Sequence, residues 1–322
     1  MINITRVQNT VIFAAKTMHE PPFSWGVANV ANAVIAGGAG WVVAPIIFVG
    51  ATTNAAMMVW RRQHNNQPFH SDYRIVQTTV NFFTRPSAYF YVTAACSIVA
   101  VAGNLSDGLR QMHIIDPDLI PRWFQGPQRS ATASFMLCGW PFLQAVGNSR
   151  YGWMLNHPTP PDPNPQPVTA GAMAKGILSK PPVYWSSGSV INGLISGGMA
   201  IAVAPVMMTI AVLHSASKVL TDHKQPSAPE SLSLSAKIVQ KLGGESTYFF
   251  AAAASFVVFF AGNMANMLKQ LNVLDLSAIP EWLQGPQRGV TACALLCTWA
   301  ALQAKGNCHY ALRMLWKERA AK

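Results

Sequence analysis

Long stretches without any charged residue constrain this chain more than any other feature of its sequence. Residues 21–60, 86–106, 181–217 and 246–268 contain no Asp, Glu, Lys or Arg. Each stretch can cross a hydrocarbon core of about 30 Å, which takes roughly 20 helical residues. A charge at the bilayer centre costs about 2.5 to 3.5 kcal/mol, so such stretches are what a lipid environment selects. They predict four transmembrane segments.

The composition agrees with a membrane protein. Charged residues make up 11% of the chain and hydrophobic residues 51%, whereas ordinary soluble domains carry roughly 25% charged residues. The remaining charge is mostly basic, with 23 Lys and Arg against 12 Asp and Glu. These bases lie between the apolar stretches and form no nucleic-acid-binding module, so they fit anionic lipid headgroups better than a nucleic acid. We therefore expect membrane lipids as partners and no nucleic acid.

The second half of the chain repeats the first. The offset is 160 residues near the start of each unit and 159 further on, where Gln-Gly-Pro-Gln-Arg occurs at 125–129 and again at 284–288. So many collinear matches indicate an internal duplication. The predicted organisation is an N-terminal segment 1–20, a membrane repeat 21–155, a Pro-rich linker 156–180, a second membrane repeat 181–316 and a basic C-terminal tail 317–322.

Each repeat holds two firm spans and a third helix that either crosses the membrane or lies at its interface. Residues 130–149 are uncharged, but Lys305 interrupts the equivalent segment of the second repeat. Three spans per repeat would give inverted halves, and two spans with an interfacial helix would give parallel halves. The expected fold is thus an all-α integral membrane protein with two tandem repeats, and we favour six spans over four.

Polar side chains inside apolar spans are costly there and are candidates for function. Side-chain amides recur at equivalent positions in both repeats, as Asn32 and Asn192, Asn104 and Asn263, and Gln144 and Gln303. Such pairs either bridge helices by hydrogen bonds or line a solute path. A proline also recurs, as Pro45 and Pro205, and predicts a kink at the same depth in each long helix.

The most specific repeated motif is Trp-Phe/Leu-Gln-Gly-Pro-Gln-Arg. Gly-Pro predicts a turn before the third helix of each repeat. The expected lipid-headgroup residues are Trp123, Gln128, Arg129, Trp282, Gln287 and Arg288. Tryptophan favours the membrane interface, and arginine at the interface favours anionic headgroups. The motif is therefore interpreted either as a structural turn and membrane anchor or, more specifically, as a pocket for an anionic lipid such as cardiolipin.

No catalytic constellation or metal-ligand set is present, and an anionic phospholipid such as cardiolipin is the one expected ligand. The absence of acids at span centres weakens a proton-coupled transporter. The leading hypothesis is a non-catalytic accessory subunit that packs helices and lipid at the periphery of a respiratory complex, supercomplex or ATP synthase, with other integral subunits as partners.

The expected location is the mitochondrial inner membrane, with the bacterial inner membrane and the thylakoid left open. The alternative is a two-repeat solute transporter with an asparagine-lined path. The two hypotheses differ in one visible respect, because a transporter needs its asparagines to converge on a cavity whereas a scaffold buries them between helices.

Overall fold

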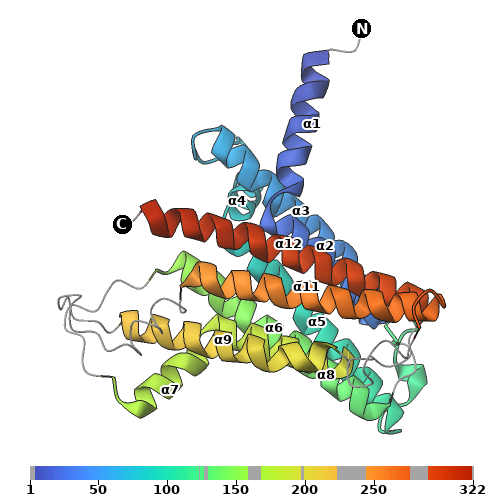
Figure 1. Cartoon of the computed structure of the whole chain (residues 1–322). Coiled ribbons are helices and arrows are strands. Elements are labelled where there is room, and N and C mark those ends of the chain that lie inside the picture. Colours follow the sequence, from blue (N-terminus) through green and yellow to red (C-terminus); the bar gives the residue numbers. More distant parts are fainter. Residues whose placement is uncertain are drawn as a thin grey trace.

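The computed structural model describes residues 4–122, 124–126, 130–158, 168–196, 199–222, 244–275 and 289–320. All regular structure in these residues is helical. The helices are α1 (Ile4–Met18), α2 (Pro21–Ala36), α3 (Ala39–Gln63), α4 (Arg74–Phe83), α5 (Ser87–Gln111), the 3-10 turn η1 (Pro117–Leu119), α6 (Ala131–Asn156), α7 (Ala170–Ser179), α8 (Pro181–Ser196), α9 (Met199–Asp222), α11 (Glu245–Gln270) and α12 (Val290–Ala320). Figure 1 shows most of them side by side in a layered bundle, from which α1 projects.

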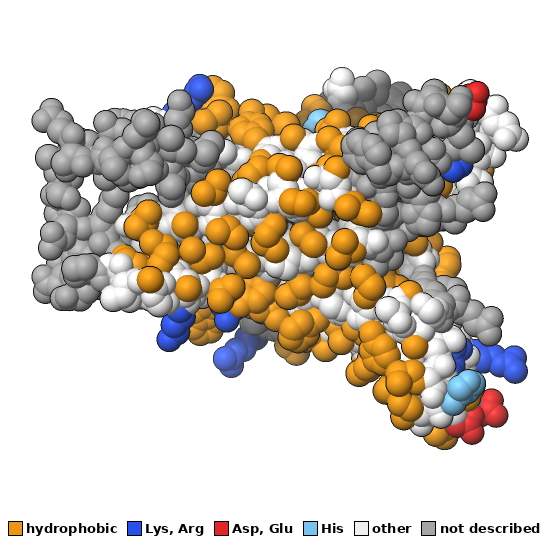
Figure 2. Space-filling view, turned by 60° about the horizontal axis from the view of Figure 1, so that its bottom comes forward, with side chains coloured by type: hydrophobic (Ala, Val, Ile, Leu, Met, Phe, Trp, Pro, Cys, Tyr) orange, Lys and Arg blue, Asp and Glu red, His pale blue; other side chains and the backbone are white. Residues whose placement is uncertain are grey.

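Four helices are long and apolar enough to cross a membrane, namely Ala39–Gln63, Ser87–Gln111, Ile201–Asp222 and Glu245–Gln270. They fall within or overlap the four stretches predicted from the sequence, which supports an integral membrane protein. Outward-facing apolar side chains occur on each of them, among them Ile46, Ile98, Val206 and Val257. On the face shown in Figure 2, apolar side chains cover the middle of the molecule, and the Lys and Arg side chains in view lie near its outline.

The long uncharged stretch at 21–60 is not the single long helix that the sequence predicted. It forms two helices, α2 and α3, that break at Gly37 and Gly38, whose φ angles of 68° and 49° suit glycine. The two helices then pack against each other, because Gly40 abuts the backbone of Ala33 and a Cβ at Gly40 would overlap it. Pro45 lies inside α3, which continues through it.

The stretch at 181–217 divides in the same way. Its first helix, α8, ends at Ser196, the second, α9, begins at Met199, and the two pack together. Pro205 lies inside α9, so here too the chain breaks before the proline. The doubled prolines at 21–22 and 181–182 stand in the first turn of α2 and of α8, where a missing N–H costs no helical hydrogen bond.

The third helix of each half runs along the bundle. In the first half, Gly152 near the end of α6 contacts Tyr91 near the start of α5. Phe135 near the start of α6 contacts Gly108 near the end of α5. The two helices are therefore antiparallel over their length. In the second half, α12 lies along α11, and the Cys297 Sγ contacts the Phe260 carbonyl oxygen at 3.8 Å. Neither α6 nor α12 is among the four helices of the described residues that are long and apolar enough to cross a membrane.

The halves exchange contacts across the middle of the molecule. Helix α2 packs against α12 of the other half, and α8 packs against α6. The two interfaces use equivalent residues. A Cβ at Gly306 of α12 would stand 2.5 Å from the Trp25 ring of α2, and a Cβ at Gly147 of α6 would stand 2.7 Å from the Trp185 ring of α8. The tight helix–helix approach is therefore made between the halves as well as within them.

The three predicted segments outside the repeats also contain helix, and α1 lies in the first of them. Helix α7 occupies the end of the region predicted as a Pro-rich linker, of which 159–167 lie outside the described residues. Helix α12 continues to Ala320, so most of the predicted basic tail is its last turn.

Candidate functional site

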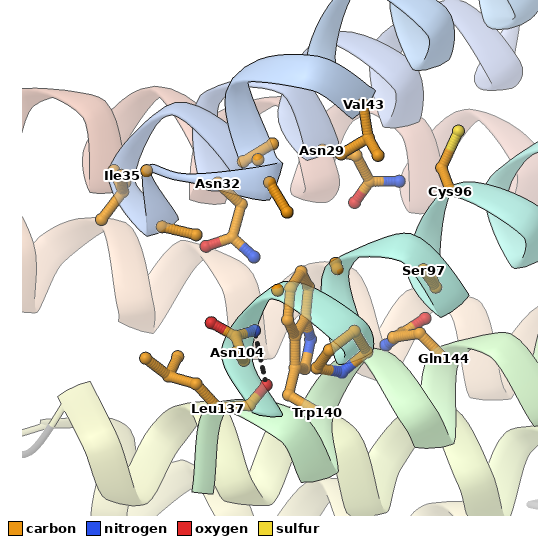
Figure 3. Close-up of a pocket in the computed structure, with 18 of the residues that line it drawn as sticks. Asn29, Asn32, Ile35, Val43, Cys96, Ser97, Asn104, Leu137, Trp140 and Gln144 are labelled. Carbon is orange, nitrogen blue, oxygen red and sulfur yellow. Dashed lines mark hydrogen bonds between the residues drawn. The ribbon is translucent and has the colours of Figure 1, made fainter. Parts of the chain in front are cut away.

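Side-chain amides converge on a cavity of about 330 Å³ inside the bundle. Figure 3 shows Asn29 and Asn32 of α2 facing Asn104 of α5 and Gln144 of α6 across this space. Asn192 of α8 brings an amide from the second half. Amides both donate and accept hydrogen bonds, so these side chains add uncharged polar groups to a lining that is otherwise mostly apolar.

The sequence prediction singled out four of these five amides. Asn32, Asn104, Asn192 and Gln144 all line the cavity, and the Asn104 Nδ2 also donates to the Leu137 carbonyl oxygen at 3.2 Å. Asn29 was not singled out, because the equivalent position in the second half is Ser189 and the repeat comparison hides it.

The two remaining predicted amides lie elsewhere. Gln303 lines a second, smaller cavity. The Asn263 Nδ2 donates to the Phe259 carbonyl oxygen one helical turn earlier, at 2.8 Å. Asn263 therefore satisfies its own helix and lines neither cavity in the described part of the chain.

The second cavity, of about 90 Å³, lies between the halves. It adjoins the first, since Asn29, Trp140 and Gln144 line both. Most of its lining comes in pairs at the repeat offsets, namely Trp25 and Trp185, Asn29 and Ser189, Tyr89 and Tyr248, Phe90 and Phe249, Trp140 and Trp299, Gln144 and Gln303, and Asn148 and Asn307. The repeat offset in the sequence would have identified these aromatic pairs, had they been read as a lining rather than as core.

Three hydrogen-bond donors on the cavity linings have no acceptor in the described structure. They are the indole N–H groups of Trp25 and Trp299 and the amide Nδ2 of Asn192. The indole N–H of Trp185, which occupies the position equivalent to Trp25, donates to the Asn148 Oδ1 at 3.0 Å. A buried donor without a partner costs about 1 to 3 kcal/mol, and these three nitrogen atoms are enclosed by the packing around them rather than open to either cavity.

One end of the second cavity is closed by aromatic rings. Trp25, Phe90, Trp185 and Phe249 pack at centroid distances of 6.1 to 6.3 Å. Behind them, equivalent residues of the two halves meet, where the hydroxyl groups of Tyr151 and Tyr310 are hydrogen-bonded to each other.

A carboxylate completes this end. The Tyr151 hydroxyl donates to the Glu245 Oε1 at 2.8 Å, and the Lys218 Nζ lies 3.7 Å from the Glu245 Oε2. Residues from both halves are thereby joined by a short chain of hydrogen bonds just beyond the aromatic rings.

Gln125 and Gly126 of the repeated motif lie beside Asp107, which lines the larger cavity. The Gly126 N–H donates to the Asp107 Oδ1 at 3.0 Å, and the Arg110 guanidinium donates to the Gln125 Oε1 at 3.0 Å and to the Gly126 carbonyl oxygen at 3.2 Å. Asp107 and Arg110 also form an ion pair at 3.3 Å. The motif thus ties the end of α5 to the turn at Gly38, whose Cβ, if present, would stand 2.6 Å from the Gly126 nitrogen.

The residues predicted to bind a lipid headgroup fall outside the described part of the chain. They are Trp123, Gln128, Arg129, Trp282, Gln287 and Arg288. Within the described ranges, no group of three or more His, Cys, Asp or Glu side chains is arranged to hold a metal ion.

Comparison with known proteins adds no identification. No protein-family model matches the chain, and no match was found among curated proteins or solved structures.

Proposed function

We propose that this protein is a membrane carrier that moves a small polar solute between its two halves. The observation that carries the proposal is the convergence of amides from α2, α5, α6 and α8 on one internal cavity. An asparagine-lined cavity is what distinguishes a transporter from a scaffold, since a scaffold gains nothing from an internal polar space. Polar groups inside a membrane protein characteristically face such cavities.

The arrangement of the halves supports a path along a pseudo-two-fold axis. Equivalent residues lie near each other at several levels, with Tyr151 beside Tyr310 and Phe90 and Phe249 both against Trp25. Asn32 and Asn192 line the same cavity further along α2 and α8. Because these pairs recur along the helices, the axis runs with the helices, which makes the halves parallel copies. Four bundle helices in each half agree with this, because an even number preserves the orientation of the second copy.

Two sets of side-chain contacts lie beside the two cavities. The Tyr151–Tyr310–Glu245 hydrogen bonds lie beside the aromatic rings of the smaller cavity, and the Asp107–Arg110–Gly126 contacts lie at the larger one, and we assign the two sets as the closures of the path. A carrier needs two closures that open in turn around a fixed site. Both closures join separate helices through side-chain contacts, so each can separate without unfolding a helix.

The accessory-subunit hypothesis rests on the lack of acids at span centres and on the basic, Trp-rich ends of the spans. Lipid headgroups suit such span ends as well as a neighbouring subunit does, so these features do not favour a scaffold. The polar cavity and its two closures are unexplained by a scaffold, and for that reason the carrier is the better proposal.

Cys96 allows a test that requires no knowledge of the solute, since it lines the larger cavity. In a variant with Ser at the other four cysteines, a membrane-impermeant maleimide should label Cys96 in proteoliposomes from at least one side. Ile98, two residues further on and outward-facing, supplies the control, because a Cys substituted there should face lipid and stay unlabelled. A folded protein in which Cys96 is labelled only after denaturation would overturn the carrier proposal.

A blocking variant provides the second measurement. Ser97→Trp places a large ring in the larger cavity, and Ile98→Trp places the same ring on the outer surface. Uptake of a panel of radiolabelled neutral solutes should be lost in the first variant and retained in the second. Equal uptake by both variants would exclude this cavity as the path.

A further inference from the structure

Helix α4 turns its polar side toward the protein and its apolar side outward. Asn81, on the polar side, exchanges two hydrogen bonds with the backbone of Phe69, at 3.0 and 3.1 Å. On the other side Ile75 is 82% exposed and Val76 is 44% exposed, and Tyr73, just before the helix, is 74% exposed. An amphipathic helix on the surface of a soluble protein has the reverse arrangement. The outer side of α4 therefore suits an apolar environment.

The level of α4 along the bundle places this side beside a membrane span rather than beyond it. The Asn54 Nδ2 of α3 donates to the carbonyl oxygens of Phe83 and Arg85, at the end of α4, at 2.8 Å each. Asn54 precedes Gln63, the last residue of the α3 span, by about 13 Å at the helical rise of 1.5 Å per residue. The end of α4 thus lies alongside the last turns of a spanning helix, where hydrocarbon gives way to headgroups.

Basic side chains flank the apolar side of α4. Arg74 opens the helix and Arg85 follows its end, and both are exposed. Asp72 is the one acidic residue in the sequence between Glu20 and Asp107. An amphipathic helix of this kind binds a membrane interface, because its apolar side is buried among acyl chains while its bases meet anionic headgroups. The charges around α4 therefore complement an anionic lipid surface.

The whole end of the bundle at which α4 lies is basic. Helices α3, α6, α9 and α12 finish at this end, and α5 and α11 begin there (Figure 1). Of the Lys and Arg side chains that the structure describes, all lie toward this end except Arg110, Arg122 and Lys269. The described acids at the opposite end are Asp107, Asp116, Asp118 and Asp275. An excess of bases marks the cytoplasmic side of a membrane protein, and the leaflet there carries the anionic lipids.

We propose that α4 is an interfacial helix that binds an anionic phospholipid leaflet and anchors the basic end of the bundle in it. Tyr73, Ile75 and Val76 lie among the acyl chains just below the headgroups, and Arg74 and Arg85 bind lipid phosphate groups. The proposal is independent of any transported solute, because it rests on the outer surface of the bundle and not on its cavities.

The position of α4 can be measured with an environment-sensitive fluorophore on single cysteines of the full-length protein, in which Ser replaces the five native cysteines. Val76→Cys carries the fluorophore on the apolar side. Thr78→Cys, two residues further and on the opposite side of the helix, is the matched control. In bilayers of phosphatidylcholine and phosphatidylglycerol, lipids brominated on their acyl chains should quench the first fluorophore and leave the emission of the second nearly unchanged. Equal quenching at both positions, or none at Val76→Cys, would overturn the proposal.

The charge of the lipid is tested with the same fluorophore at Val76→Cys, by comparison of brominated phosphatidylglycerol with brominated phosphatidylcholine at equal mole fraction. The anionic lipid should quench more strongly. Arg74→Gln together with Arg85→Gln should remove this preference, which is roughly five-fold for each base close to an anionic surface. Arg122→Gln, at the other end of the bundle, is the matched control and should leave the preference unchanged. The same preference in the double variant, or no preference before the arginines are changed, would overturn the assignment of an anionic lipid.

Discussion

The two halves carry an ion pair at the same pair of positions with the charges exchanged. In the first half, Glu20 pairs with Arg62, and 160 residues later Lys180 pairs with Asp222 at 2.6 Å. Both pairs join the start of the shorter helix of the hairpin to the end of the longer one. If both charges of the pair are reversed together, the two side chains still attract each other, whereas reversal of one charge alone would make them repel. The contact between these positions, rather than the identity of either residue, is what the two halves share.

The environments of the two pairs differ. The Glu20 side chain is 3% exposed and accepts a second, bidentate pair of hydrogen bonds from Arg313 of α12 at 2.6 and 2.8 Å. The Lys180 and Asp222 side chains are 18% and 54% exposed. Glu20 therefore joins both hairpin helices to the other half, while the second pair closes its own hairpin at the surface. Buried and exposed ion pairs differ widely in their contribution to stability.

Glu20→Gln should produce the largest effect. It leaves Arg62 and Arg313 without a carboxylate, and breaking a buried pair costs about 3 to 5 kcal/mol. Lys180→Met in the exposed pair should cost under about 1 kcal/mol. Equilibrium unfolding in mixed detergent and SDS micelles measures both. Equal costs would contradict the difference in burial between the two pairs.

The charge exchange itself can be transplanted. Lys180→Glu with Asp222→Arg should restore the stability lost in either single variant, because the second pair has no further partner in the described contacts. Glu20→Lys with Arg62→Asp should not, since the lysine introduced at position 20 would then face Arg313. A full recovery in the first half would show that Arg313 contributes little.

Two glycines test the correspondence of the halves in their packing. Gly147→Ala and Gly306→Ala each place a methyl group against a tryptophan ring, Trp185 in one case and Trp25 in the other. Overpacking of this kind costs about 1 to 3 kcal/mol, and we expect the two costs to agree within about 0.5 kcal/mol. Thermal unfolding followed by size-exclusion chromatography measures them. A large difference would break the symmetry between the α2–α12 and α6–α8 contacts.

Acidification should act on the first pair. Burial opposes ionisation of Glu20, but the hydrogen bonds from Arg313 and Arg62 outweigh it and hold the pKa of this carboxyl below its ordinary 4.5. Because the folded pKa lies below the unfolded one, the stabilisation is complete above about pH 4.5 and is lost as the pH falls through the folded pKa. The slope is at most about 1.4 kcal/mol per pH unit for one proton.

Unfolding measured over this acidic range in the wild type and in Glu20→Gln isolates the contribution of Glu20. The variant should show a smaller loss of stability on acidification, because its amide does not titrate. Parallel curves for the two proteins would assign the acid sensitivity to other carboxylates.

The smallest expected effect compares two equivalent indoles. Trp185→Phe removes a hydrogen bond to Asn148 and should cost about 1 kcal/mol beyond the loss of ring area. Trp25→Phe removes an N–H that has no acceptor in the described structure. Its cost in stability should therefore come from the loss of ring area alone. The difference between the two variants in thermal unfolding is the quantity to compare.

Individual residues show which parts of the candidate site could be predicted from the sequence. The repeat offset and the cost of polar groups in lipid selected Asn32, Asn104, Asn192 and Gln144, which line the cavity, but also Asn263, which does not. An amide in a span can satisfy the carbonyl one turn earlier or face a cavity, and no spacing distinguishes the two. Trp25 and Trp185 were visible as a repeated pair, yet an aromatic side chain in an apolar helix has the same pattern in a core and at a cavity.

The sequence by itself determined the helical membrane class and the positions that carry amides, and the offset at which residues recur predicts a duplication. These inferences depend on local composition and on the spacing of residues, and both can be read along a single chain. The tertiary structure alone decided that the stretches at 21–60 and 181–217 form two helices each. In the first stretch the break requires the positive φ angles of Gly37 and Gly38 and the close approach of Gly40 to Ala33. It alone also decided that α2 packs on α12 and α8 on α6. That exchange places the smaller cavity between the halves, and it depends on which apolar faces are complementary in shape, which a one-dimensional pattern does not record.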